Sequence, residues 1–447
     1  MLEKFFKLKE NGTDVKTEVI GGVTTFMAMA YILAVNPSIL SASGMDAQAI
    51  LIATALASFV GTMCMALMAN YPFALAPGLG LNAYFAFTVC GTMGYSWQFA
   101  LFAVFAEGII FVILSLTNVR EAIFDSIPLQ LKKGVSVGIG LFIAFIGLEN
   151  GSIVVNSDST LVTFVNFRDD FTNVGICALL ALIGLLIISI LYVKKVKGAI
   201  LIGIFATWFL GIIAQLTGLY TGLSVLPVWS DFNIAAIGKT FGQCFTAEAF
   251  ANFNVLDFFA IMCAFLFVDI FDTLGTLIGC ADKAKMLDKD GKLPRIKPAL
   301  LADSIATSVG AIFGTSTTTT FVESSSGVSE GARTGLASVV TALLFLVSIV
   351  LSPIFIAIPS FATAPALIFV GFLMIMAVKD ISFENPIEAI PAYIALLTMP
   401  LTYSISDGIA FGIISYVILH VFGGKAKDVK PLMYILAVLF ILKYIFL

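Results

Sequence analysis

Charged side chains are scarce in this sequence. Only 12% of its 447 residues are charged and 60% are hydrophobic, whereas about 25% of the residues in a soluble domain are charged. A soluble protein of this composition could not cover its surface with polar groups, so the composition predicts lipid as the solvent for much of the chain. Apolar stretches long enough to cross a hydrocarbon layer of roughly 30 Å recur. They should be helices, because lipid offers no partner to free backbone groups.

Groups that do chemistry are also scarce. The one histidine, His420, ends an apolar stretch, and we expect it at the membrane interface. No nucleotide-binding loop, metal-ligand cluster or nucleophile–base pair is visible. This argues against an ATP-driven pump or a membrane hydrolase, and predicts neither a cofactor, a bound metal nor a nucleic-acid partner. The cysteines lack paired short spacings and are expected to be small buried apolar side chains rather than disulfides or metal ligands; they are Cys64, Cys90, Cys177, Cys244, Cys263 and Cys280.

The apolar stretches predict fourteen membrane segments. The first seven lie near residues 18–36, 47–69, 72–89, 97–117, 131–148, 173–193 and 198–218. The second seven lie near 255–280, 299–313, 316–334, 336–357, 363–379, 387–402 and 405–422. The remaining apolar stretch, 431–447, is short for a span, and we expect a helix packed on the bundle or lying at the interface.

Basic residues test this topology. With the N-terminus inside, all of the 24 lysines and arginines except Arg168 and Lys239 fall on the inner side. One miscounted span would scatter that asymmetry, so the positive-inside rule supports the count and a cytoplasmic N-terminus. The even number predicts a cytoplasmic C-terminus as well. Residues 1–18 contain several lysines and are expected to be a short amphipathic or disordered leader rather than a cleavable signal.

Seven spans followed by seven predict an inverted repeat. Duplication of an odd-numbered unit gives two halves of opposite orientation, with the site near the midplane where irregular segments meet. The segment Thr54–Gly61 aligns loosely with Asp303–Gly310. In both halves an irregular span follows, and this matching position carries more weight than the short alignment.

The third and tenth spans are the irregular ones. The third, 71–86, has two prolines and two glycines in its first ten residues, which forbid a continuous helix. The tenth, 314–327, is too polar to face lipid, and its threonine run favours extended backbone. Each is predicted to be an extended stretch followed by a half-helix whose N-terminus offers N–H groups to a ligand. The alternative for 314–327 is a Ser/Thr loop outside the membrane.

Two acids mark the eighth span. Asp269 and Asp272 are three residues apart, so both side chains point to one side of a helix. A charge at the bilayer centre costs roughly 2.5–3.5 kcal/mol, and two adjacent carboxylates disfavour joint ionisation. They are candidates for a proton site, a Na⁺ site or a ligand that donates N–H groups. The alternative is a pair of capping or packing acids at the membrane edge, and Asp272 could instead hold Asp269 in place.

Further candidates lie in the two irregular spans. Glu323 is placed where the extended stretch of the tenth span becomes helical, and Asn82 is placed at the comparable junction of the third. Either could bind a ligand or merely cap a helix. Phe73, Phe271 and Phe321 could stack on a planar ligand, although ordinary packing explains most of the 41 phenylalanines. Two more acids, Glu107 and Asp303, are expected to be supporting groups.

Four separated motifs resemble those of one transporter family. They are Thr17–Tyr31, Ala76–Tyr84, Val268–Gly275 and Gly314–Val328. These motifs resemble the AzgA-like hypoxanthine/adenine/guanine permeases of the nucleobase–cation symporter-2 group, and the resemblance extends essentially from end to end. It implies the seven-plus-seven fold of the uracil permeases, import of a purine by cation symport, and a homodimer in the cytoplasmic membrane. Whether the coupled cation is H⁺ or Na⁺ stays open at this point.

The resemblance also implies an organisation and residue roles. Residues 1–117 and 251–357 would form a core domain, and residues 118–250 and 358–447 a gate that it moves against. Asp269 and Glu323 would be the main base-contacting acids and, with Asp272, the candidates for cation coupling. The remaining implied contributors to the site are Gly80, Asn82, Asp272, Thr273, Phe321 and Val322. Where the uracil branch has a histidine this chain has Thr273, so that branch's protonation chemistry does not transfer.

Three rival functions remain at this point. An anion transporter of the same architecture, for sulfate or bicarbonate, would place its anion at the half-helix N-termini. Three carboxylates would repel such an anion. A passive channel would lack a coupling cation, and a membrane enzyme would need catalytic groups that are not visible.

Overall fold

The computed structural model describes residues 2–117, 126–229, 232–251, 253–288 and 293–446. Among these residues, ten helices are long and apolar enough to cross a membrane. Two shorter apolar helices run Pro386–Thr402 and Pro431–Leu442. The all-α polytopic class is therefore confirmed, while the number of fourteen spans stays a prediction. The expected domain boundary after residue 117 falls at 118–125, outside the described residues.

The first half of the chain supplies helices up to α10. Its elements are α1 (Leu2–Phe6), α2 (Val15–Met29), α3 (Ile32–Leu40), α4 (Ala47–Cys64), β1 (Leu75–Pro77), α5 (Leu79–Ala83), α6 (Trp97–Thr117), α8 (Leu129–Asn150), β2 (Val154–Ser157), β3 (Leu161–Phe164), α9 (Ile176–Val193) and α10 (Ala199–Leu216). Wider π-helical turns, Met65–Ala69 and Tyr84–Thr92, continue α4 and α5.

The second half supplies the rest. Its elements are α11 (Val255–Lys283), α12 (Ile296–Phe313), β4 (Thr318–Thr320), α13 (Ser324–Ser329), α14 (Gly335–Ser348), α15 (Ser352–Ile356), α16 (Ser360–Ile375), α17 (Pro386–Thr402), α18 (Ile405–Phe422) and α19 (Pro431–Phe446).

The first span is interrupted, which the sequence did not indicate. Asp14 accepts a hydrogen bond from the backbone N–H of Thr17 (2.8 Å) and caps α2, so the helix begins at Val15. It ends at Met29, and α3 begins at Ile32 after a turn. The leader is ordered too, because α1 packs its Phe6 against α14.

A two-stranded sheet joins the two irregular spans at the centre of the molecule. β1 and β4 pair antiparallel, with Leu75 opposite Thr320 and Pro77 opposite Thr318. Hydroxyl groups from neighbouring helices satisfy the outer edges, since the N–H of Leu75 donates to Thr62 Oγ1 (2.9 Å) and Thr307 Oγ1 donates to the carbonyl of Thr318 (3.0 Å). The extended stretches predicted in both spans are confirmed. The threonines of 315–320 are buried, none more than 2% exposed, so this segment is not an outside loop.

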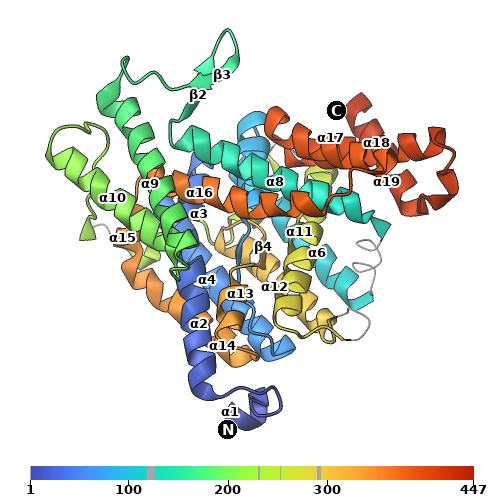
Figure 1. Cartoon of the computed structure of the whole chain (residues 1–447), viewed down its shortest axis with the longest axis horizontal. Coiled ribbons are helices and arrows are strands. Elements are labelled where there is room, and N and C mark those ends of the chain that lie inside the picture. Colours follow the sequence, from blue (N-terminus) through green and yellow to red (C-terminus); the bar gives the residue numbers. More distant parts are fainter. Residues whose placement is uncertain (1, 118–125, 230–231, 252, 289–292, 447) are drawn as a thin grey trace.

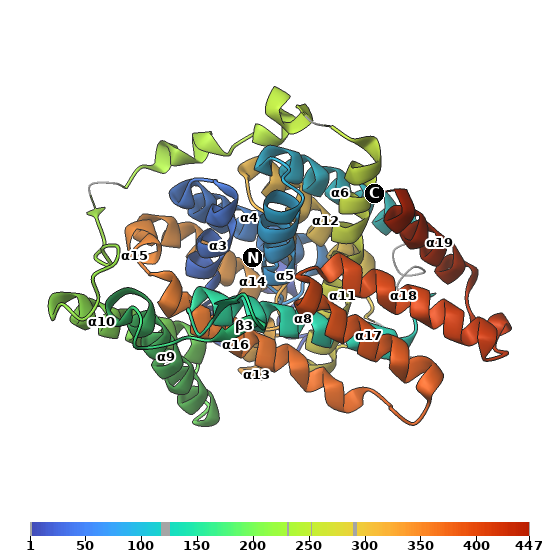
Figure 2. The ribbon, with the colours of Figure 1, turned by 90° about the horizontal axis from the view of Figure 1, so that it is seen from above.

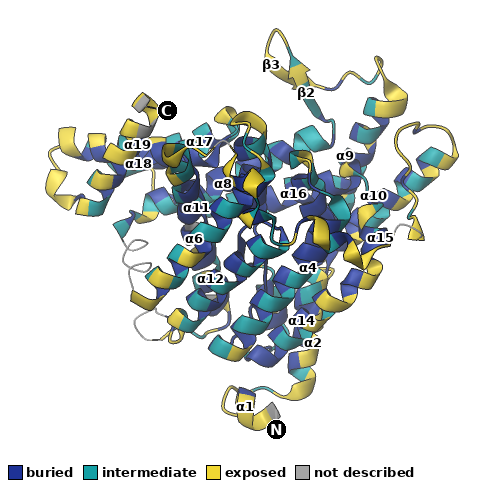
Figure 3. Cartoon of the chain, turned by 180° about the vertical axis from the view of Figure 1, so that it is seen from behind, coloured by how far each residue is buried: buried dark blue, intermediate teal, exposed yellow. Residues whose placement is uncertain are grey.

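The helices pack in two groups around this sheet. α2, α4, α6, α12 and α14 pack on one another below the sheet as Figure 1 is drawn. α8, α16, α17 and α18 form the second group, and α9 and α10 pack beside α16. The half-helix α5 touches α8 and α11, and α13 packs against α2 and α11, so both half-helices lie where the groups meet. Figure 3 shows dark buried residues concentrated there and exposed residues towards the periphery.

Two long connections carry their own structure. β2 and β3 form a hairpin that projects from the top of Figure 1. Short 3₁₀ turns between α10 and α11 run along one edge of the molecule past α4 and α6 (Figure 2). This connection is tied to α4 by Lys239 and Asp46 (2.6 Å). Although partial burial opposes it, the hydrogen bonds from Lys239 and from the N–H of Ala49 lower the pKa of Asp46.

The C-terminal apolar stretch is a helix packed on the bundle, one of the two arrangements expected for it. α19 packs along α18, and Tyr444 near its end donates a hydrogen bond to Asp407 in the first turn of α18 (2.6 Å). The two helices therefore run antiparallel, and the chain ends far from the N-terminus (Figure 1). The expectation that both termini are cytoplasmic stays a prediction. His420 lies in the last turn of α18 and is buried at 4% exposure beside Tyr416; its interfacial depth stays a prediction.

Candidate functional site

A cavity of about 640 Å³ opens beside the central sheet. Its volume lies within the roughly 300–1,000 Å³ of small-molecule pockets. β4 and the start of α13 form one side, and α11 and the start of α5 form another. The apolar remainder comes from α8 and α16, through Ile139, Ile143, Val370, Leu373 and Met374. The cavity thus lies between the two packing groups of helices.

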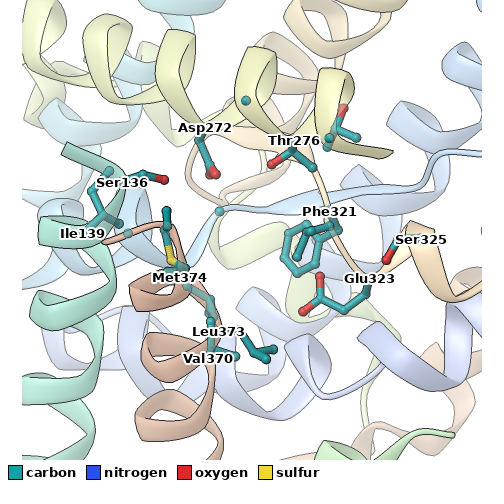
Figure 4. Close-up of a pocket in the computed structure, with 18 of the residues that line it drawn as sticks. Ser136, Ile139, Asp272, Thr276, Phe321, Glu323, Ser325, Val370, Leu373 and Met374 are labelled. Carbon is teal, nitrogen blue, oxygen red and sulfur yellow. The ribbon is translucent and has the colours of Figure 1, made fainter. Parts of the chain in front are cut away.

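Two carboxylates face this cavity. Asp272 projects from α11, and Glu323 projects from the residue that precedes α13. Figure 4 shows both directed into the cavity from different elements, with the ring of Phe321 beside Glu323. Oε1 of Glu323 accepts a hydrogen bond from the hydroxyl of Tyr31 (2.6 Å). Acceptors at two separate positions suit a ligand that donates hydrogen bonds from two of its edges.

Asp269 lies behind this surface. It is fully buried and is not among the residues that line the cavity. The hydroxyl of Thr273 is 2.9 Å from Oδ1 of Asp269, 3.0 Å from Oδ1 of Asp303 and 2.8 Å from Oγ1 of Thr319. The structure therefore places Asp269 and Thr273 in a buried polar layer between α11, α12 and β4. Asp272, which we ranked second, is the acid of α11 that faces the cavity.

The other supporting acid, Glu107, also lies close to the central sheet. Glu107 of α6 accepts a hydrogen bond from the hydroxyl of Thr317, just before β4 (2.7 Å). Both Glu107 and Asp303 are fully buried. They stabilise the extended segment of the tenth span and do not line the cavity, as expected of supporting groups.

The third span contributes backbone rather than charge. Gly78, the residue before α5, and Gly80 both line the cavity. A Cβ atom on Gly78 would lie 2.8 Å from Cγ2 of Thr319 and 3.4 Å from Oδ2 of Asp272. A Cβ atom on Gly80 would lie 2.9 Å from Cγ2 of Ile139 on α8. Glycine is needed here because α5 approaches both its neighbours closely.

Asn82 is not at the junction where we placed it. α5 begins at Leu79, so Asn82 lies inside the helix and Gly78 occupies the junction. The Asn82 side chain is fully buried, and its Nδ2 donates to the carbonyl of Pro77 (3.4 Å). The structure does not bring Asn82 to the cavity surface.

The aromatic candidates separate clearly. Phe321 and Val322 line the cavity, and Val322 is 51% exposed. Phe73 is fully buried and stacks on Tyr71, with ring centroids 5.2 Å apart. It is not among the residues that line the cavity. The side chain of Phe271 lies outside the described residues.

Several lining residues were missed by the sequence analysis. Tyr31 carries no charge and sits in an apolar motif, so nothing local distinguished it from packing. Its one sequence signal is that it ends the first of the four family motifs, Thr17–Tyr31. The remaining missed polar groups are Ser136, Tyr192, Thr276, Lys283, Thr320, Ser325 and Ser326.

Part of the cavity lining comes from the ends of helices. Tyr192 at the end of α9, Lys283 at the end of α11 and Met376 just after α16 line it on the side that the charge distribution predicts to be cytoplasmic. Towards the other side, Thr88 Oγ1 donates to the carbonyl of Tyr403 (3.1 Å). The hydroxyl of Tyr403 donates in turn to Glu149 at the end of α8 (2.7 Å). The two groups of helices are therefore in contact beyond the half-helices.

Comparison with known proteins identifies relatives along the whole chain. Residues 16–411 match a family model that is labelled for xanthine and uracil permeases and described as the permease family. A permease of Methanocaldococcus jannaschii is 50% identical over 446 residues, which cover 100% of this chain and 98% of that protein. The guanine/hypoxanthine permease PbuO of Bacillus subtilis is 45% identical, covering 98% of this chain and 99% of that protein. The adenine permease AdeP of Escherichia coli is 41% identical, covering 100% and 96%.

Solved structures share the fold. The transmembrane domain of the cyanobacterial bicarbonate transporter BicA superposes with a TM-score of 0.64, covering 89% of this chain and 97% of that domain. Its sequence identity is 16%. The similarity therefore concerns the arrangement of helices and not the transported substance.

Proposed function

This chain belongs to the permease family, and we propose that it imports purine nucleobases, namely hypoxanthine, guanine and adenine, together with a cation. It is a multi-pass membrane protein and a transporter rather than an enzyme, as its family and relatives are. The relatives PbuO and AdeP are named for guanine, hypoxanthine and adenine. We extend that substrate class to this chain, whose sequence aligns with theirs from end to end.

One observation carries the substrate class, namely that Asp272 and Glu323 face a single cavity from two different elements. A purine carries N–H groups on both of its rings, and ionised carboxylates act only as acceptors. Its flat face suits the ring of Phe321, which lies beside Glu323. An apolar wall of Ile139, Val370 and Leu373 completes a slot for a planar, uncharged ligand.

The coupling cation in this proposal is a proton, with Asp269, Asp272 and Glu323 as its candidate carriers. Hydrogen counting at Thr273 supports it. That hydroxyl has one hydrogen to donate but lies within 3.0 Å of oxygens on both Asp269 and Asp303. A proton on either carboxylate would satisfy the contact, and a small cation between them is the alternative that Na⁺ coupling requires.

Transport in this proposal follows alternating access. Residues 1–117 and 251–357 form a core that carries the base, and residues 118–250 and 358–447 form a gate. The two packing groups of helices, and the position of the cavity between them, support this division. Movement of the core would break the contact of Thr88 with Tyr403 and open the other side. The proposed setting is a homodimer in the cytoplasmic membrane with the N-terminus inside.

The rival function is anion transport, because BicA shares the fold. Two carboxylates facing the cavity would repel a bicarbonate or sulfate ion. Lys283 at the mouth is the cationic side chain among the described residues that line the cavity. The charge of the site therefore favours the purine.

Uptake into proteoliposomes tests the proposal. The purified chain is reconstituted, and uptake of labelled hypoxanthine, guanine, adenine, bicarbonate and sulfate is measured with and without an inward proton gradient. We expect saturable purine uptake that the proton gradient accelerates and that a protonophore suppresses. Bicarbonate or sulfate uptake without purine uptake would overturn the substrate class, and purine uptake that follows a Na⁺ gradient instead would overturn proton coupling.

A further inference from the structure

Tyr31 occupies the break in the first span. α2 ends at Met29 and α3 begins at Ile32, so Tyr31 belongs to the turn between them. Its side chain is 1% exposed, yet it lines the cavity. Its hydroxyl donates to Oε1 of Glu323 at 2.6 Å, the separation of a charge-assisted O–H···O⁻ bond.

This hydrogen bond makes the two carboxylate oxygens of Glu323 unequal as acceptors. An ionised glutamate has two acceptor oxygens and no donor. Tyr31 takes up part of the accepting capacity of Oε1, so we assign Oε2 to a ligand in the cavity. Fixing a glutamate side chain costs rotamer entropy, and the hydrogen bond from Tyr31 restrains this one before a ligand arrives.

Close packing of α2 against the chain around α13 fixes the positions of Tyr31 and Glu323 relative to one another. α2 and the chain around α13 approach backbone to backbone, since a Cβ atom on Gly327 would lie 2.4 Å from the carbonyl oxygen of Gly21. At the start of α2 the carboxylate of Glu18 accepts the N–H groups of Arg333 (2.7 Å) and Ala337 (3.1 Å). These contacts hold α2 against α13 and α14, and so hold Tyr31 in register with Glu323.

We propose that Tyr31 is the positioning residue of Glu323, and that it sets the selectivity of the site for the one purine nitrogen that donates to Oε2. The inference rests on the proposed function, because it requires that Glu323 binds the transported base. Without the hydroxyl, the carboxylate would rotate and accept hydrogen bonds from more than one direction. The affinity for the purine would fall, and the preference for one N–H position would weaken at the same time.

Ligand competition on the purified full-length chain tests the inference. Binding of labelled guanine is measured in the presence of unlabelled guanines that each carry one methyl group, at N1, N7 or N9. In the unaltered chain, methylation of the nitrogen that contacts Glu323 should weaken binding most. In Tyr31→Phe, guanine affinity should fall about tenfold, and that largest methylation penalty should shrink at least about threefold while the other penalties change less than about twofold.

Two further variants complete the design. Tyr434→Phe is the matched control. It removes the hydroxyl of a tyrosine on α19, which is not among the residues that line the cavity and donates to the carbonyl of Ala426 (2.9 Å). Glu323→Asp keeps the charge but withdraws the carboxylate from Tyr31, so it should flatten the same penalty even if Tyr31→Phe does not accumulate as folded protein.

The outcomes are separable. Affinity of Tyr31→Phe within twofold of the unaltered chain overturns the inference, and so does a fall in affinity that leaves the ratios of the methylation penalties unchanged. The latter result would mean that Tyr31 only supports the fold. If the unaltered chain binds no purine, the proposed function itself fails, and the role of Tyr31 in purine selection fails with it.

Discussion

The third and tenth spans have the same backbone form but present different side chains to the cavity. In each, a three-residue strand is followed by a short helix, and the strands pair with one another. The span of β1 and α5 presents Gly78 and Gly80 to the cavity. The span of β4 and α13 presents Thr320, Phe321 and Glu323. The first therefore supplies shape and the second supplies charge and an aromatic face.

This difference follows from what each span must contact. α5 packs between β4 and α8, and a Cβ atom on either cavity-lining glycine would clash. The segment before α13 is held by polar side chains of α6 and α12, since Thr317 donates to Glu107 (2.7 Å) and Thr307 donates to the carbonyl of Thr318 (3.0 Å). One symmetric scaffold can thus divide close approach and ligand recognition between its halves.

The largest expected effect is on the charged side of this comparison. Glu323→Gln replaces an acceptor-only carboxylate with an amide whose nitrogen cannot accept the N–H of a base. We expect purine affinity to fall about 10- to 100-fold, measured as the dissociation constant of labelled guanine. The matched control is Glu330→Gln at the other end of α13, where the carboxylate pairs with Lys197 (2.7 Å). Equal losses in both variants would contradict the assignment of charge recognition to Glu323.

The two acids of α11 should separate next. Asp272→Asn should weaken purine binding about tenfold, because this carboxylate faces the cavity. Asp269→Asn should leave affinity within about threefold and lower the free energy of unfolding by about 1–3 kcal/mol, because it disrupts the buried contact with Thr273. Binding isotherms and thermal unfolding of both variants test this. The opposite order would restore Asp269 as the base-contacting acid.

That ranking marks where sequence reasoning reaches its limit. The breaks in the third and tenth spans were predictable because proline, glycine and a threonine run are local signals. The spacing of Asp269 and Asp272 correctly put both on one side of α11. It could not say which of them would face the cavity, because the rotation of α11 about its axis is set by its packing against β4 and α12.

Other features were beyond a local signal for similar reasons. Asn82 was placed at a helix junction because helix boundaries are uncertain by several residues, and α5 in fact begins three residues earlier. Tyr31 contacts Glu323 across 292 positions of sequence. The antiparallel packing of α19 on α18 brings Tyr444 to Asp407, and the hydrophobic periodicity of the sequence does not predict this contact.

Gly80→Ala probes the shape side of the comparison with a smaller effect. The new methyl group would press on Cγ2 of Ile139, and such overpacking costs about 1–3 kcal/mol. Because α5 lies in the proposed core and α8 in the proposed gate, we expect the rate of purine uptake to fall about 3- to 10-fold. Ile139→Ala in the same chain should recover much of the rate. Gly91→Ala near the end of the same span is the control, since its Cβ atom would make an ordinary 3.5 Å contact. No recovery in the double variant would contradict the steric explanation.

The smallest effect is expected at Asn82. Its Nδ2 makes one long hydrogen bond to Pro77, and its buried Oδ1 has no hydrogen-bond partner among the described residues. Asn82→Ala should therefore change purine affinity less than about threefold and the free energy of unfolding by about 0.5–1.5 kcal/mol. Ser324→Ala, the comparison in the other half, should cost more stability, about 1–3 kcal/mol, because it leaves the buried N–H of Ala74 without its acceptor. Affinity and thermal unfolding of the pair test this order. A tenfold loss of affinity in Asn82→Ala alone would show that the shape-supplying span also binds the base through a side chain.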